Sequence, residues 1–151
     1  LKSQEKAHDR GYSQVLWLDG VERKYVEEIG TSNAFFVIGD EVITAPLEGT
    51  ILPGITRDSV IQLLKDWGVK VSERKITIED IFKAYDEGKL SEVFASGTAA
   101  VISPVGELGW KAREIIINGN QIGDLSRKLY DTLSGIQLGK VEDKFGWTVE
   151  V

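Results

Sequence analysis

The stretch TILPGITRDSVIQLLKDWG, Thr50–Gly68, joins the end of an apolar strand pattern to a helical pattern. Pro53 and Gly54 interrupt the strand, and threonine, here Thr56, is a residue type that caps helices. Apolar residues then recur at spacings of three and four as far as Gly68, and glycine is common just beyond a helix end. We therefore expect a helix that begins near Thr56 and ends before Gly68. Its apolar positions are Val60, Ile61, Leu63, Leu64 and Trp67.

The start of this expected helix is a candidate anion site. The first backbone N–H groups of a helix have no acceptor inside it, and the positive end of the helix dipole lies beside them. A phosphate group bound just after the Pro-Gly turn would satisfy those donors. The alternative is that Thr56 and Asp58 cap an ordinary helix, so this stretch by itself leaves the ligand undecided.

Composition excludes several classes of function. With 151 residues and 42% hydrophobic positions, the chain is long enough for one well-buried core. A net charge of −6 argues against nucleic acid or an anionic membrane surface as the main partner. The chain has no cysteine, and His8 is its single histidine, so we expect neither a metal site nor a Ser-His-Asp triad. No membrane span or secretory leader is visible, and we expect a cytoplasmic protein.

The first third of the chain predicts a short helix and two antiparallel hairpins. Residues 2–10 have the pattern of a helix that ends at Gly11. One hairpin is expected over residues 13–30, turning at Asp19 and Gly20. The second is expected over residues 34–45, and it turns at Gly39 and Asp40.

The rest of the chain interleaves strands and helices, which predicts one mixed α/β domain. Thr77 and Asp80 form a capping-box pattern at the start of a helix that Gly88 ends. Further strands are expected over 69–77, 92–97, 99–105 and 113–119, with a loop between the last two. A final helix carries an apolar stripe formed by Ile122, Leu125, Leu129, Leu133 and Ile136.

Two carboxylates at the end of an expected strand could contribute to a site. The stretch VEEIGTSNAFF places Glu27 and Glu28 side by side, and alternation sends them to opposite faces of the sheet. A carboxylate that faces a site could accept a hydrogen bond from a protonated ring nitrogen and hold that ring in its cationic form. The alternative is that both are ordinary surface acids on an edge strand.

The stretch FASGTAAVISP forms a turn of small residues between two expected strands. Backbone N–H groups and the Thr98 hydroxyl in the segment Ser96–Ala99 could approach an anion closely, because no large side chain intervenes. An ordinary tight turn uses the same residue types. Both interpretations remain open on this stretch alone.

Taken together, EEIGTSNAFF, ILPGITRD and SGTAAVISPV, in this order, resemble the branched-chain aminotransferases, which are fold-type-IV pyridoxal-phosphate enzymes. The resemblance extends from GYSQVLWLDG to the final EDKFGWTVEV and corresponds to the large, C-terminal domain of that family. It implies that residues 1–151 form a single α/β domain with a mixed, barrel-like sheet and flanking helices. The VLWL and EIGTSN stretches favour this family over its sister families, the D-amino-acid aminotransferases and the aminodeoxychorismate lyases.

The resemblance also implies a cofactor, pyridoxal 5′-phosphate, and a role for particular residues. Glu28 matches the carboxylate that pairs with the pyridine nitrogen, which selects it over Glu27. The remaining matches are Gly54, Ile55, Thr56 and Thr98 for the cofactor phosphate, Thr98 and Ala99 for the substrate carboxylate, and Thr31 for the side-chain pocket.

The implied reaction transfers the amino group of L-leucine, L-isoleucine or L-valine to 2-oxoglutarate, in a homodimer. The family's cofactor-binding lysine and its Gly-Gly-Asn-Tyr motif would precede Leu1, and Lys2 has no such neighbours. The family's small N-terminal domain would also precede Leu1, so we expect a fragment without a catalytic lysine and without activity of its own. The alternatives are a sister fold-type-IV enzyme and a non-catalytic phosphate-binding domain.

Overall fold

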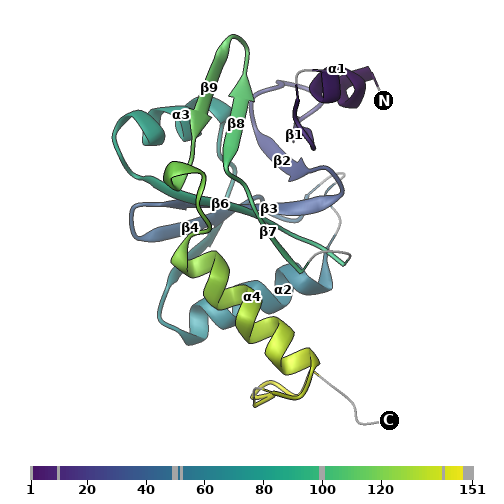
Figure 1. The fold of residues 1–151 in the computed structure, drawn as a ribbon, viewed down its shortest axis with the longest axis vertical. Coiled ribbons are helices and arrows are strands. Elements are labelled where there is room, and N and C mark those ends of the chain that lie inside the picture. The colour runs from purple at the N-terminus through teal and green to yellow at the C-terminus, as the bar shows by residue number, and fades with distance from the viewer. Residues whose placement is uncertain are drawn as a thin grey trace.

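The structure, a computed structural model, describes residues 2–9, 11–48, 51, 53–98, 101–140 and 142–147. Within these ranges strands and helices are interleaved, as the sequence predicts (Figure 1). The elements are α1 Lys2–Asp9, β1 Leu16–Leu18, β2 Val26–Ile29, β3 Ser32–Ile38, β4 Glu41–Thr44, α2 Ile55–Asp66, β5 Lys70–Glu73, α3 Ile78–Asp86, β6 Leu90–Ser96, β7 Ile102–Pro104, β8 Glu107–Trp110, β9 Arg113–Ile116, the 3₁₀ turn η1 Asn118–Asn120 and α4 Asp124–Gln137.

Strand β3 is the centre of a mixed sheet. Its residues 33–37 are all buried, so both of its faces are covered. Along one edge it pairs antiparallel with β6, and along the other edge it pairs first with β2 and then with β4. The rings of Phe35 and Phe94, which are direct partners, stack with centroids 5.0 Å apart. Burial of each such ring stabilises the fold by about 1.5–3 kcal/mol.

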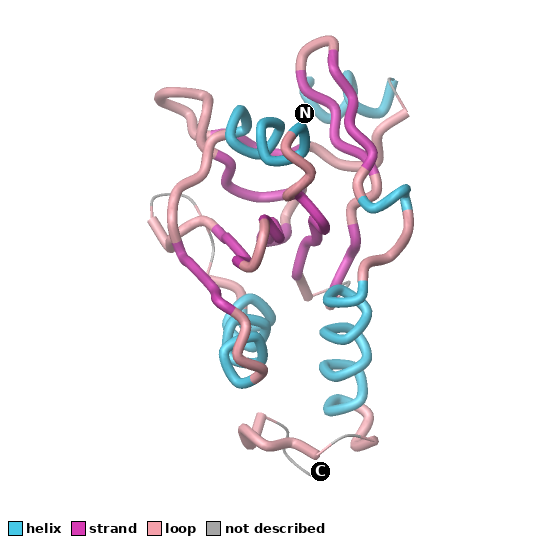
Figure 2. The backbone as a smooth tube through the Cα atoms, turned by 90° about the vertical axis from the view of Figure 1, so that its left-hand side faces the viewer, coloured by secondary structure: helices cyan, strands magenta, loops and turns pink. Residues whose placement is uncertain are grey.

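Helices and a hairpin cover the two faces of this sheet. Helices α2 and α4 lie on one face, over a core that includes Phe35, Leu64 and Leu129. Helix α3 and the β8–β9 hairpin lie on the other face, over a core that includes Phe36 and Ile81 (Figures 1 and 2). The sheet therefore separates two apolar cores, and the expected α/β class with flanking helices is confirmed.

Strands β4 and β5 and the intervening α2 form a β-α-β unit. The two strands are parallel, with Thr44 opposite Glu73, so their carboxyl ends lie at the same edge of the sheet. Helix α2 begins at that edge, because the chain must return over the sheet to start β5. Ligands in open α/β sheets bind where the carboxyl ends of strands meet a helix start.

The two expected hairpins form, but only one has a tight turn. Ile38 pairs with Glu41 across a two-residue turn, and Gly39 has a φ of 61°, which glycine adopts without strain. The hairpin predicted around Asp19 and Gly20 forms with a longer loop, because strand pairing resumes only at Val26. The intervening loop folds around the side chain of Asp19 instead.

Several expected boundaries are wrong. The segment between β7 and β9 is not a loop, because Glu107–Trp110 pairs with Arg113–Ile116 as β8. Two glycines in the stretch VGELGW are unusual in a strand, which explains why the pattern favours a loop. The strand expected over 69–77 ends at Glu73, and the strand expected over 113–119 ends at Ile116. The last helix begins at Asp124, so Ile122 lies outside it and is 51% exposed.

The start of α4 is capped from another element. The carboxylate of Glu92, on β6, accepts hydrogen bonds from the backbone N–H groups of Leu125 and Ser126 and from the Ser126 hydroxyl, at 3.1, 2.9 and 2.7 Å. Gly123 precedes the helix, and a Cβ atom there would lie 2.0 Å from the Glu92 carboxyl carbon. A negative charge at a helix start is favourable, so Glu92 fixes α4 to the sheet.

We expect Glu92→Ala to lower the free energy of unfolding by about 1–2 kcal/mol, because it removes a charged acceptor from the helix donors. Urea unfolding of the protein and the variant measures this difference. Glu114→Ala, at an exposed position on β9, is the matched control and should have little effect. Equal losses from the two substitutions would contradict the capping role of Glu92.

The carboxylate of Asp19 organises the loop between β1 and β2. It accepts hydrogen bonds from the backbone N–H groups of Glu22, Lys24 and Tyr25, at 2.6, 2.9 and 2.9 Å. The bond from Glu22 contributes most to lowering the pKa of Asp19 from 3.8 to about 2. The loop therefore favours the ionised form of this side chain.

This lowered pKa predicts how the stability contribution of Asp19 depends on pH. Because the pKa is lower in the folded protein than in the unfolded chain, the contribution is fully present above about pH 4 and is lost as the pH falls towards 2. The difference in unfolding free energy between the protein and Asp19→Asn should therefore be constant between about pH 5 and 7 and shrink below about pH 4. A difference that grows on acidification would show that the ionised carboxylate does not stabilise the loop.

Candidate functional site

The start of α2 lies against the beginning of β3. Gly54 is the N-cap residue, with extended backbone angles, and its carbonyl accepts the Asp58 N–H at 3.1 Å. A Cβ atom on Gly54 would lie 2.5 Å from Oδ1 of Asn33, a contact too short for any real side chain. Glycine is therefore needed for the close approach of this turn to the buried Asn33 side chain.

The prediction that Thr56 caps the helix is wrong, because the helix already begins at Ile55. The helix therefore begins two residues earlier than the threonine pattern suggests, after the extended backbone of Gly54. The Thr56 hydroxyl instead donates a long hydrogen bond, 3.5 Å, to the carbonyl of Gly97 at the end of β6. The structure thereby brings the Gly54–Thr56 segment to the Ser96–Thr98 turn, and the sequence indicates both stretches as candidate anion sites.

The helix starts differ in how their donors are satisfied. Helix α3 has a complete capping box, in which Thr77 and Asp80 each accept a backbone hydrogen bond, as predicted. Helix α4 has Glu92. No side-chain cap is described for α2, whose first residue, Ile55, is 88% exposed. Among these three helices, α2 is the one for which the described part of the chain supplies no capping side chain, so its first N–H groups could bind an external anion.

Neighbouring strands align three polar residues on the face that carries α2. Glu28 is opposite Asn33, and Asn33 is opposite Ser96. Directly paired residues project to the same face, and Phe35 and Phe94, two positions further along, lie in the core under α2. Glu28 is half-buried and the other two are buried. The Ser96 hydroxyl has no hydrogen-bond partner within the described part of the chain.

Glu27 lies on the other face, as alternation predicts. Ile29, two positions further along β2 and therefore on the same face as Glu27, is buried in the core under α3. Glu27 itself lines a separate cavity of about 630 Å³, together with Tyr25, Ala45 and Lys75. Only Glu28 shares a face with the start of α2.

Arg57 is a buried charged residue of the site that the sequence pattern did not single out. This residue lies in the first turn of α2, and as a whole it is 3% exposed. One nitrogen, Nη2, donates to the Ala45 carbonyl at 2.9 Å and to the Glu73 carboxylate at 2.7 Å. The sequence does contain a signal that this side chain is buried, which is its spacing. Arg57 lies on the same helical stripe as Val60, Ile61 and Leu64.

The remaining predicted residues are not all gathered at this junction. Thr98 is exposed beside Gly97, and Ala99 lies outside the described residues. Thr31 is exposed in the turn between β2 and β3 and lines a cavity of about 600 Å³ with Ala95 and Ser103. The described lining of that cavity includes neither the start of α2 nor Thr98.

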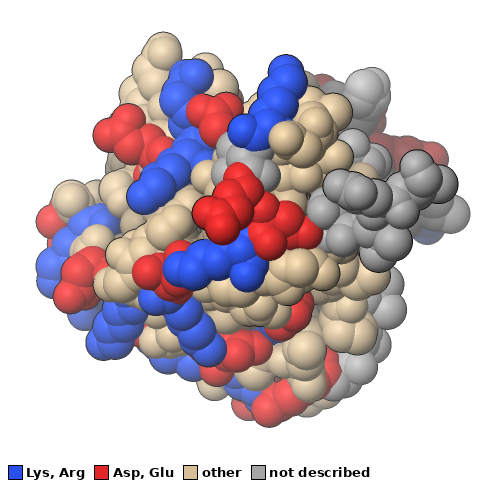
Figure 3. All heavy atoms as spheres, turned by 90° about the horizontal axis from the view of Figure 1, so that it is seen from below, with Lys and Arg blue, Asp and Glu red and all other residues tan. Residues whose placement is uncertain are grey.

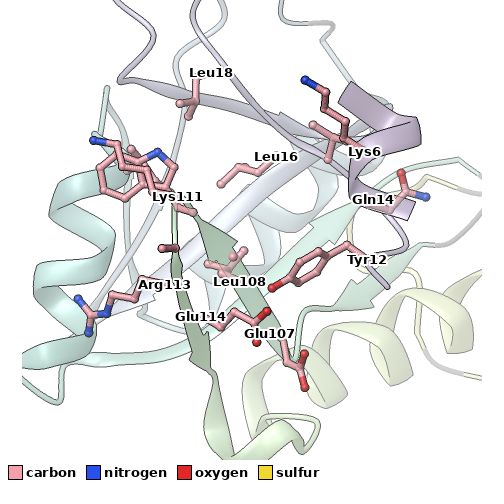
Figure 4. A pocket seen from close by; sticks show the side chains of 15 residues that line it. Lys6, Tyr12, Gln14, Leu16, Leu18, Glu107, Leu108, Lys111, Arg113 and Glu114 are labelled. Atoms are coloured by element: carbon pink, nitrogen blue, oxygen red, sulfur yellow. The ribbon is translucent and has the colours of Figure 1, made fainter. Parts of the chain in front are cut away.

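A further cavity, of about 610 Å³, lies between α1, β1 and the β8–β9 hairpin (Figure 4). Tyr12 and Leu16 face Leu108 across it, and Lys111 and Arg113 lie at the hairpin end. None of the described residues predicted to bind an anion lines it. It therefore gives no support to a second anion site.

The surface carries charges of both signs. On the face seen in Figure 3, Lys and Arg side chains are interspersed with Asp and Glu side chains, without a broad basic patch among the residues described there. In the described part of the chain, no helix is both long enough and apolar enough to cross a lipid bilayer.

Comparison with known proteins gives the family of this chain. Residues 1–108 match the family Amino-transferase class IV. The chain belongs to the class IV aminotransferases. A protein of Staphylococcus epidermidis named probable branched-chain-amino-acid aminotransferase is 61% identical over 151 residues, which are the whole of this chain and 42% of that protein. The class IV aminotransferase chain thus spans less than half the length of the curated relatives it matches.

Solved structures of branched-chain aminotransferases share the fold of this class IV chain. The enzyme of Escherichia coli superimposes with a TM-score of 0.79 and 32% identity, over 95% of this chain and 43% of that one. A T.th. enzyme, in complex with N-(5′-phosphopyridoxyl)-L-glutamate, superimposes with a TM-score of 0.79 and 29% identity, over 97% and 45% of the two chains. The expected mixed-sheet fold of the type-IV aminotransferases is therefore confirmed.

We expect Gly54→Ala to weaken phosphate binding at the candidate anion site, because the new Cβ would push the helix start away from Asn33. The packing conflict should also cost about 1–3 kcal/mol of stability. Gly20→Ala is the matched control, since nothing lies within 4 Å of a Cβ at that position. Phosphate titration, followed by backbone amide NMR shifts, measures the effect, and unchanged affinity in Gly54→Ala would contradict the close approach.

Proposed function

We propose that this chain is the cofactor-binding part of a pyridoxal-phosphate-dependent branched-chain-amino-acid aminotransferase. The observation that supports this most strongly is the uncapped start of α2 beside the Gly97–Thr98 turn, on the sheet face that also carries Glu28. The start of α2 and the turn can bind the phosphate of a phosphorylated pyridine, and Glu28 can bind its protonated ring nitrogen. Family membership supports the same assignment.

The residues present fit the phosphate of this cofactor. The backbone at Gly54, Ile55 and Thr56 would hold the phosphate with helix donors, and Thr98 would add a hydroxyl. Gly54 leaves room for a close backbone approach. The buried Ser96 hydroxyl, which has no described partner, indicates that the junction retains unused hydrogen-bonding capacity.

Glu28 would hold the proton on the pyridine nitrogen. An ionised carboxylate beside that nitrogen favours its protonated form, and Glu28 is half-buried, which strengthens the interaction relative to a fully exposed pair. The chemistry that pyridoxal phosphate supplies when bound is electron withdrawal from the carbon that loses its proton. Glu28 increases that withdrawal by keeping the ring cationic.

For the substrate we propose a carboxylate site at Thr98 and Ala99 and a side-chain contact at Thr31. A turn of small residues can present N–H donors to a carboxylate without steric obstruction. Exposed Thr31, on the wall of a cavity of about 600 Å³, is accessible to an apolar side chain.

We further propose that the whole protein transfers the amino group of L-leucine, L-isoleucine or L-valine to 2-oxoglutarate, as a cytoplasmic homodimer. The names of the relative from Staphylococcus epidermidis and of the superimposable structures support the branched-chain substrate class. A sister enzyme that acts on D-amino acids or a lyase substrate is the second candidate, since it would use the same phosphate site. A non-catalytic phosphate-binding domain is the third.

We expect Glu28→Gln, in the protein that carries this chain, to reduce kcat by about 100-fold or more while the fold is retained, because the ring nitrogen loses the charge that keeps it protonated. Glu27→Gln is the matched control on the opposite face and should change kcat by less than about threefold. Steady-state kinetics with L-leucine and 2-oxoglutarate measures both. Equal losses would show that the wrong carboxylate has been assigned.

The same assay separates the candidate functions. Turnover of L-leucine with 2-oxoglutarate supports the proposed enzyme, and turnover of D-alanine in its place would support a sister family. A protein that binds pyridoxal phosphate but converts neither substrate would favour the non-catalytic domain.

A further inference from the structure

We propose that Arg57 is a positioning residue that sets the first turn of α2 for recognition of the cofactor phosphate. This inference rests on the proposed function, because it assigns a role at the same site. Arg57 does not itself face the anion. It acts through the helix start that carries the anion-binding donors.

The contacts of Arg57 tie α2 to the carboxyl ends of two strands. Its Nη2 atom donates to the carbonyl of Ala45, directly after β4, and to the carboxylate of Glu73, the last residue of β5. Those strands are parallel, so both acceptors lie at the edge of the sheet where α2 begins. The two hydrogen bonds therefore fix where the first turn of the helix lies relative to that edge.

Arg57 is buried, and packing alone does not explain why a charged residue occupies this position. Its side chain is 4% exposed in the ion pair with Glu73, whose side chain is 44% exposed. In the other ion pairs among the described residues, every cationic side chain is at least 46% exposed. A buried guanidinium costs desolvation free energy, and an apolar residue at the same position on the stripe would avoid it. The directional contacts are what arginine adds.

The position of Arg57 links those contacts to phosphate binding. It is the third residue of α2, directly after Ile55 and Thr56, whose backbone would bind the anion. Gly54, on the other side, is already held close to Asn33. A shift of this turn by a fraction of an ångström would misalign its N–H groups, and aligned donors are what binding at a helix start requires.

The test compares two ligands that differ only in the phosphate. In the protein that carries this chain, dissociation constants for pyridoxal phosphate and pyridoxal are measured for the parent protein and for Arg57→Met, Arg57→Lys and Glu73→Gln. The matched control is Lys144→Gln, which removes the ion pair with Asp66 at the far end of α2. Circular dichroism and thermal unfolding show which variants retain the fold.

The ratio of interest is the dissociation constant of pyridoxal divided by that of pyridoxal phosphate. We expect Arg57→Met to lower this ratio by about 10-fold or more, because only binding of the phosphate depends on the helix start. Arg57→Lys, which keeps the charge without the planar fork, should recover part of that loss. Lys144→Gln should change the ratio by less than about twofold. If Arg57→Met fails to fold, Glu73→Gln still tests the proposal, and we expect it to lower the ratio by about threefold.

Two results would overturn the proposal. Equal weakening of both ligands would show that Arg57 supports the fold in general, and an unchanged ratio in the Arg57 and Glu73 variants would show that the helix start does not depend on it. If either result is found and the parent protein binds pyridoxal phosphate, the proposed function stands and only the role of Arg57 is refuted. A parent protein that binds neither ligand refutes the proposed function and this inference with it.

Discussion

The antiparallel register of β3 with β2 and β6 is the constraint on which the rest of the structure depends. It places Glu28, Asn33 and Ser96 in one row, and it places Phe35 and Phe94 in contact beneath α2. A slip of one residue would move the whole row to the opposite face and expose apolar side chains of both cores. The same apolar burial that stabilises the sheet therefore determines which carboxylate can face the candidate site.

Chain connectivity supplies the second half of the site. A parallel pair needs a long crossover, and here the crossover contains α2, so a helix start is delivered to the carboxyl ends of β4 and β5. Among the described residues no side chain caps the first N–H groups of this helix, and Arg57 ties its first turn to the ends of both strands. At the equivalent place the Thr77 hydroxyl accepts a helix N–H group in α3, and the Glu92 carboxylate accepts two in α4, so these donors are already satisfied.

Features set by neighbouring residues were predictable from the sequence, and features set by distant residues were not. The capping box of Thr77 and Asp80 and the turn at Gly39 depend on adjacent positions and were predicted correctly. Thr56 was misassigned as a cap, because the helix begins earlier, after Gly54, and the Thr56 hydroxyl bonds to Gly97, which follows β6 and is 41 positions away. Arg57 was missed for a related reason, since a buried cation is stable only through partners that are distant along the chain. Strand β8 was missed although its partner β9 follows directly in the chain, because its glycines obscure the strand pattern.

The dependence of Arg57 on β5 has a consequence for the order of folding. Hairpins such as β2–β3 and β3–β4 join residues close in sequence and can form early, whereas the parallel β4–β5 pair must close a loop that contains all of α2. Until that pair forms, the guanidinium lacks its carboxylate partner and keeps only the Ala45 carbonyl as a hydrogen-bond acceptor. During synthesis, the role proposed for Arg57 therefore begins only after Glu73 has left the ribosome and β5 has paired with β4.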